Sequence, residues 1–82
     1  MSTLVVNVTK NDILEGVRSS PGWCPIALAV RRRTKAADVN VGTMSADVGK
    51  RTYLVPAETR QFIIAFDMKQ FVKPGRYKLI SK

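Results

Sequence analysis

The chain has 82 residues, of which 45% are hydrophobic and 24% charged, and its 14 Lys and Arg against 6 Asp and Glu give a net charge of +8. This length and composition predict one globular domain with a small core, which leaves little room to enclose a large cofactor. The longest apolar run, residues 26–30, is too short to span a membrane, and the N-terminus lacks the pattern of a secretory signal, so we expect a cytoplasmic protein without membrane contact.

The first eighteen residues predict a strand followed by a short helix. Residues 3–8 are rich in β-branched side chains, which favours a strand. Thr9 and Asp12 have the spacing of a capping box at the start of a helix over about residues 10–18. Three apolar residues fall on one face of this helix: Ile13, Leu14 and Val17.

A turn and a second helix follow. The stretch SSPG, residues 19–22, is typical of a turn. Cys24 as the N-cap and Pro25 in the first turn predict a helix that runs to about residue 34. Its C-terminal end is cationic, which suits the negative end of the helix dipole.

The second half of the chain predicts three strands and one helix. Alternating residues predict strands over 38–41 and 51–55, joined by a loop of about eight residues. Residues 56–69 form the clearest helical pattern, in which four residues define a buried stripe: Thr59, Phe62, Ile63 and Phe66. After a turn at residues 73–75, a last strand over 76–80 places Tyr77 and Leu79 on one face.

This order of elements predicts an α+β fold for residues 1–82, as a single basic domain. We expect three or four strands in a largely antiparallel sheet, with helices packed on one face. With the first two helices counted as one connection, the order also matches the βαββαβ plan of ferredoxin-like domains.

The residue inventory argues against an enzyme and against a metal or cofactor site. The chain has no His, its single Cys cannot build a zinc site, and its five glycines form no phosphate-binding loop. Asp12 and Glu15 form the only close acidic pair, and their place in the first turn of a helix explains them. Cys24 at a helix N-terminus is interpreted as a small buried cap, although a reactive thiol remains the alternative there.

The positive charge points to the candidate binding residues. Residues 1–30 are neutral overall, so the whole excess lies in residues 31–82. Such density attracts acidic protein surfaces or phosphate backbones, whereas a merely solvated basic face is the plainer interpretation. Trp23 either anchors a partner or covers the two helices. The candidate partner-binding residues are Trp23, Arg31, Arg32, Arg33, Lys35, Lys69, Lys73, Arg76 and Lys78, with Lys82 extending the C-terminal group.

Sequence-specific nucleic-acid recognition fits poorly. In a helix-turn-helix the N-terminal residues of the second helix read the bases, but here the arginines lie at the opposite end of the helix. An RNA-recognition domain needs several aromatic residues on its third strand, and residues 50–55 offer only Tyr53. Binding to the phosphate backbone without base specificity stays open.

Three stretches resemble a group of short proteins encoded in tailed-phage genomes: NDILEG at 11–16, WCPIALA at 23–29 and VPAETRQFIIAFD at 55–67. Members of that group often carry another Cys before the Cys-Pro pair, where this chain has Ser19, Ser20 and Pro21. The resemblance implies a phage accessory protein that acts in the host cytoplasm. We therefore expect a non-enzymatic protein that binds an acidic host protein in an inhibitory or anti-defence role, with nucleic-acid binding as the alternative.

Overall fold

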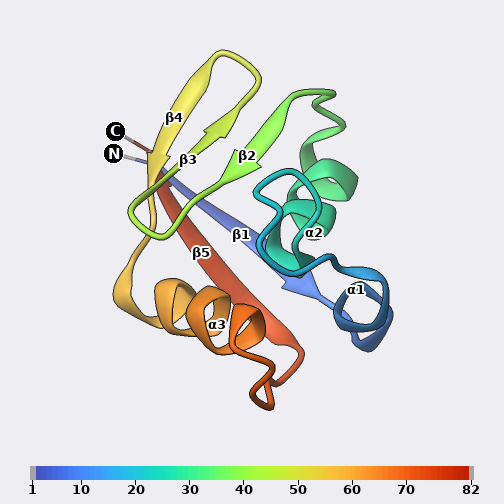
Figure 1. Cartoon of the computed structure of the whole chain (residues 1–82). Coiled ribbons are helices and arrows are strands. Elements are labelled where there is room, and N and C mark those ends of the chain that lie inside the picture. Colours follow the sequence, from blue (N-terminus) through green and yellow to red (C-terminus); the bar gives the residue numbers. More distant parts are fainter. Residues whose placement is uncertain (1, 82) are drawn as a thin grey trace.

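A five-stranded antiparallel sheet forms the centre of the computed structural model, which describes residues 2–81 (Figure 1). Its strands are β1 (Thr3–Val8), β2 (Val39–Val41), β3 (Ser45–Val48), β4 (Arg51–Leu54) and β5 (Gly75–Ser81). Their order across the sheet is β1-β5-β4-β3-β2, and every neighbouring pair is antiparallel. The predicted α+β class and antiparallel sheet are confirmed.

One strand was not predicted. β3 lies inside the expected loop and pairs with β2 on one side and β4 on the other. Gly49, with a φ of 60°, and Lys50 form the tight turn that joins β3 to β4. The element order therefore has one strand more than the βαββαβ plan, and β1 is an edge strand whose only partner in the sheet is β5.

The three helices are α1 (Lys10–Glu15), α2 (Pro25–Thr34) and α3 (Ala57–Asp67). The predicted caps are present: Thr9 and Asp12 form the capping box, and the Cys24 Sγ accepts a hydrogen bond from the Ala27 backbone N–H at 3.4 Å. α1 is shorter than predicted because Gly16 ends it against the Pro25 ring, where a Cβ atom would lie 2.6 Å from the proline Cδ.

The sheet is curled, and α2 and α3 pack against it around one core, while α1 lies beyond the end of β1 and packs against α2 (Figure 1). α2 packs against both edge strands, β1 and β2, and α3 packs against β5. The predicted stripe of α3 is buried, and the Phe62 ring contacts the Tyr77 ring edge-on at 4.7 Å between centroids. The prediction that Tyr77 and Leu79 share one face is therefore confirmed, and that face points to the core, with Leu79 fully buried and Tyr77 partly so.

Candidate functional site

Arg31 makes several contacts within the fold. Its guanidinium lies 4.4 Å from the centre of the Trp23 ring, and its Nε donates to the Gly22 carbonyl at 3.1 Å. Further hydrogen bonds reach the carbonyls of Ala37 and Val39. Arg31 therefore joins the loop before α2 to the segment that leads into β2.

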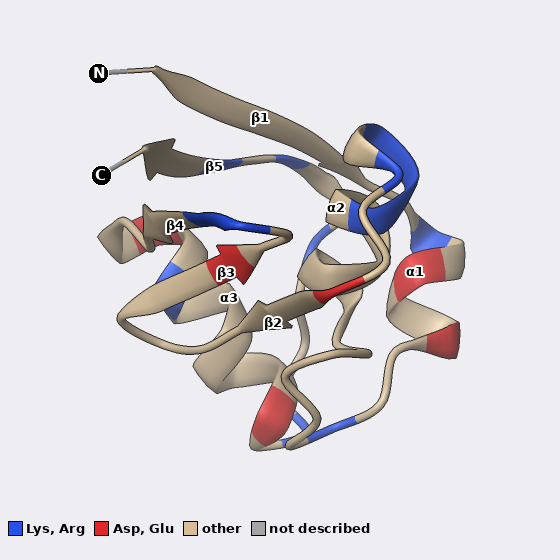
Figure 2. Ribbon diagram, turned by 90° about the horizontal axis from the view of Figure 1, so that it is seen from above, with Lys and Arg blue, Asp and Glu red and all other residues tan. Residues whose placement is uncertain are grey.

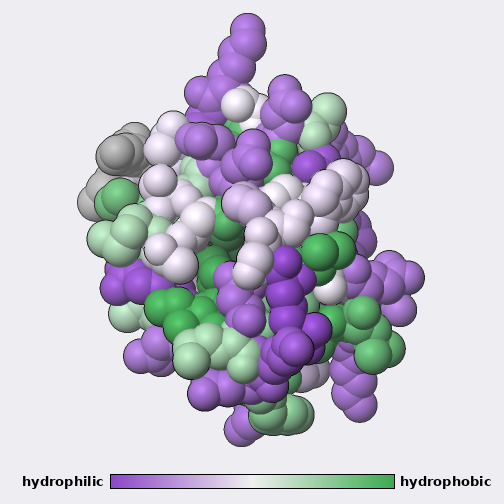
Figure 3. Space-filling view, viewed as in Figure 1, coloured by the Kyte–Doolittle hydropathy of each residue, from purple (hydrophilic) through white to green (hydrophobic). Residues whose placement is uncertain are grey.

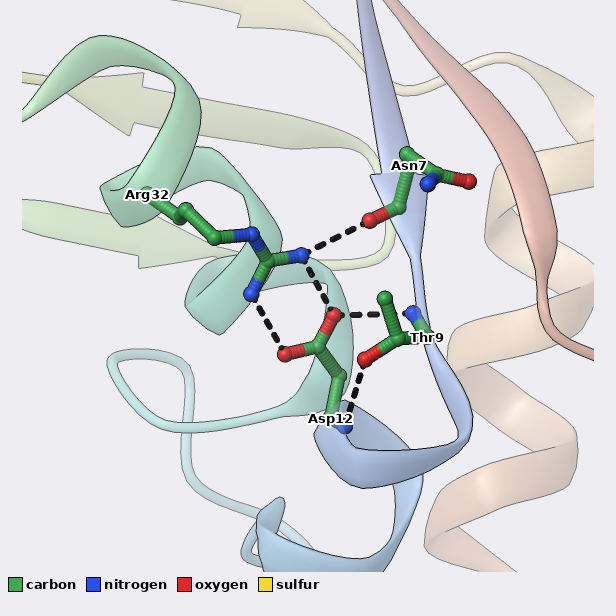
Figure 4. Close-up of polar contacts among 4 residues, drawn as sticks. All are labelled: Asn7, Thr9, Asp12 and Arg32. Carbon is green, nitrogen blue, oxygen red and sulfur yellow. Dashed lines mark hydrogen bonds and ion pairs between the residues drawn. The ribbon is translucent and has the colours of Figure 1, made fainter.

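Arg32 is also a structural residue (Figure 4). Its two terminal nitrogens each donate to the Asp12 carboxylate at 2.8 Å, and one of them also donates to the Asn7 carbonyl at 2.8 Å. The Asp12 side chain is only 5% exposed, whereas that of Arg32 is 53% exposed. Burial alone would raise the pKa of Asp12, but hydrogen bonds from Arg32 and the Thr9 backbone outweigh it and lower that pKa below its usual value.

Trp23 is partly exposed and belongs with Arg31. About half of its surface, 53%, is open to solvent, while its ring faces the Arg31 guanidinium. The two residues are eight positions apart in the sequence, and they meet because the long Arg31 side chain reaches back to the loop before α2, where it also bonds to the Gly22 carbonyl. The Trp23 ring therefore packs against Arg31, while about half of the residue's surface stays accessible to solvent.

The remaining predicted cations are exposed, but they do not form one cluster. Arg33 and Lys35 lie at the C-terminal end of α2, and Lys69 and Lys73 lie in the α3–β5 connection, residues 68–74. Arg76 and Lys78 alternate with the core-facing residues of β5 and therefore point to its outer face. Figure 2 shows basic positions on α2 and β5, and a further one on the neighbouring β4 that the sequence analysis did not single out. Lys82 lies outside the described residues.

An apolar hollow lies elsewhere, between α1 and the α3–β5 connection. A hollow of about 520 Å³ is lined mainly by apolar side chains, with Lys10 and Arg18 also contributing to its walls. Leu14 on one side is 82% exposed and Phe71 on the other is 83% exposed. We call this hollow the apolar groove; its apolar lining is Ile13, Leu14, Phe66, Phe71, Val72 and Pro74.

The apolar groove has a positive rim. The Arg18 guanidinium lies 5.3 Å from the centre of the Phe66 ring, so its charge is held at the groove wall by a cation–π contact. Lys10 is exposed at the start of α1. Figure 3 shows hydrophobic atoms at the surface over α1, at the lower right of the view, with hydrophilic atoms around them. The groove thus combines apolar contact area with charges that attract acidic groups.

The sequence analysis missed this site because it placed Leu14 with Ile13 and Val17 on one apolar helix face and gave that face no role in binding. In the structure only Ile13 of the predicted face packs on the core, while Leu14 and Val17 are exposed. The available indication was Phe71, a large apolar residue in a polar connection next to Lys69 and Lys73. Phe71 lines a groove only because α1 lies next to the α3–β5 connection, and no local sequence pattern predicts that arrangement.

Cys24 is a buried cap in the structure. Its pKa is raised by burial, an effect that exceeds the opposing influence of the backbone N–H groups of Ala27 and Ile26. The thiol is therefore less ionised than an ordinary cysteine, contrary to what its place at a helix N-terminus alone suggests. Within residues 2–81, no group of three or more His, Cys, Asp or Glu side chains is placed to hold a metal ion.

Comparison with protein-family models, curated proteins and solved structures finds no match to this chain. Among the described residues, no helix is both long enough and apolar enough to cross a membrane. The assignment of function therefore rests on the geometry of the site.

Proposed function

We propose that this chain is a small non-enzymatic accessory protein that binds an acidic protein partner at the apolar groove. The observation that carries the proposal is the pairing of Leu14 and Phe71, both more than four fifths exposed, across one hollow with cations on its walls. Covering a large apolar side chain contributes about 1.5–3 kcal/mol, and the positive rim favours an acidic partner over a basic one. The resemblance to short tailed-phage proteins adds a host protein as the expected partner.

The other exposed cations support the same partner at longer range. A net charge of +8 accelerates encounter with an acidic protein whether or not every cation touches it. We assign this role of attracting the partner to the exposed Arg33, Lys35, Lys69 and Lys73. Arg31 and Arg32, in contrast, are already bonded to other residues of the fold. The proposed contact residues therefore shift from the arginine run to the groove.

The proposal is tested by capture of host protein on immobilised chain after nuclease treatment. We expect an acidic protein to be retained by the wild type and lost, by about tenfold or more, from the Leu14→Ser, Phe71→Ser double variant. Met44→Ser is the matched control, because Met44 is 65% exposed and lies outside the apolar groove. Equal retention by all three proteins would show that the groove does not bind the partner.

Backbone-directed nucleic-acid binding is the second candidate, and the outer face of the sheet favours it. Arg76 and Lys78 stand on the outer face of β5, and no hydrogen bond or ion pair within residues 2–81 engages either side chain. Binding there predicts an affinity for DNA or RNA that falls steeply between about 50 and 200 mM salt and is weakened by Arg76→Ser. No mobility shift at low salt would eliminate this candidate.

A further inference from the structure

Phe71 is the wall between two hollows. Beside the apolar groove lies a second hollow of about 310 Å³, between α3 and the connection that follows it, lined by Glu58, Gln61 and Ala65 among others. Phe71 and Val72 line both hollows. We call the second one the α3 hollow. Because they share these residues, the two hollows adjoin at Phe71, which is 83% exposed.

The Phe71 ring is presented by a segment that is fixed on both sides. Before it, the Gln70 backbone N–H donates to the Ala65 carbonyl at 2.8 Å; after it, the Tyr77 hydroxyl donates to the Lys73 carbonyl at 2.8 Å. Val72, the next residue, packs against the core. Because the backbone is held in place, a partner that covers Phe71 loses little binding free energy to ordering this segment.

The two hollows differ in charge. The apolar groove has Lys10 and Arg18 on its walls and no acidic residue. The α3 hollow has one acid, Glu58, and one base, Lys73. The potential therefore falls from positive to about neutral across Phe71, and a partner segment with carboxylates at one end would bind in one direction.

We propose that the two hollows hold a short acidic segment of the partner protein in a single direction. One apolar side chain fills each hollow on either side of Phe71, and the segment's carboxylates lie over Lys10 and Arg18. Hollows of about 300 to 500 Å³ lie at the lower end of the range for ligand pockets, which suits one bulky side chain each. This inference rests on the proposed function and adds the form and direction of the bound segment.

The experiment uses a synthetic twelve-residue peptide as the probe. It carries Glu at its first, second and fourth positions, Leu at its fifth and ninth positions, and Ala and Gln elsewhere. Titration of the isotope-labelled full chain is followed by amide chemical shifts. We expect shifts at Leu14 and Phe71, and an affinity reduced about tenfold by either Phe71→Ala or Arg18→Glu. Met44→Ala, outside both hollows, serves as the control and leaves the affinity unchanged.

The direction in which the peptide binds is determined with a nitroxide spin label attached to one end of the peptide or to the other. A label at the acidic end is expected to broaden the amide signals of Lys10 and Arg18, and a label at the opposite end those of Gln61 and Ala65. Equal broadening around both hollows from either label would overturn the single direction, as would an unchanged affinity in Arg18→Glu. The proposed function fails separately if the capture experiment retains as much host protein on the Leu14→Ser, Phe71→Ser double variant as on the wild type.

Discussion

Arg31 and Arg32 are neighbours in the sequence, yet they bind the two opposite edges of the same sheet. Arg31 donates to the Val39 carbonyl of β2 at 3.5 Å, and Arg32 donates to the Asn7 carbonyl of β1 at 2.8 Å. Edge strands carry unpaired carbonyl groups that invite pairing with other chains. By packing against both edge strands, α2 supplies a donor within the chain to one carbonyl on each of them.

The ion pair between Arg32 and Asp12 predicts that replacing Arg32 alone destabilises the fold. Arg32→Gln leaves the nearly buried Asp12 carboxylate without its cation, so we expect the free energy of unfolding to fall by about 1–3 kcal/mol. The measurement is urea unfolding at neutral pH. Arg33→Gln, an exposed neighbour on the same helix, is the control and should change stability by less than about 0.5 kcal/mol. Equal effects of the two substitutions would contradict the assigned role.

The same pair predicts how stability depends on pH. Because the pKa of Asp12 is lower in the folded chain than in the unfolded one, its contribution is present above about pH 4 and is lost as the pH falls toward the folded-state pKa. The difference in unfolding free energy between wild type and Arg32→Gln should therefore be larger at pH 6 than near pH 2.5. A difference that stays constant over this range would show that the charge of Asp12 is unimportant.

The buried hydroxyl of Thr59 predicts that its removal lowers the free energy of unfolding. This hydroxyl donates to the Lys78 carbonyl at 2.8 Å and accepts from the Lys78 backbone N–H at 3.3 Å, where α3 meets β5. Thr59→Val leaves both backbone groups unpaired, so we expect the unfolding free energy to fall by about 1–3 kcal/mol. The exposed Thr52→Val is the matched control, and a comparable loss there would refute the explanation.

Cys24 is expected to react slowly. A buried thiol with a raised pKa offers little thiolate to a reagent, so modification by an aromatic disulfide at pH 8 should be at least about tenfold slower in the folded chain than in concentrated urea. The rate is followed by absorbance of the released thiolate. A folded-state rate equal to that in urea would restore the reactive thiol as a functional candidate.

Elements defined by neighbours in the sequence were predictable. The capping box of Thr9 and Asp12, the Cys24 cap and the buried stripe of α3 all depend on spacings of three or four residues, which side-chain chemistry alone can encode. β3 was missed because residues 45–48 are few and half polar. Its strand conformation comes from pairing with β2 and β4, an interaction that local propensity does not contain.

By itself, the sequence determined the α+β class, the helix starts, the buried stripe of α3 and the sign of the net charge. The tertiary structure alone decided which charged and apolar residues are free to bind. It places α2 against both edge strands, where Arg31 and Arg32 bond to them, and it places Leu14 and Phe71, which are far apart in the chain, on the two sides of one groove. The physical reason is that a side chain's availability depends on the partners the fold supplies, and these partners come from distant parts of the sequence.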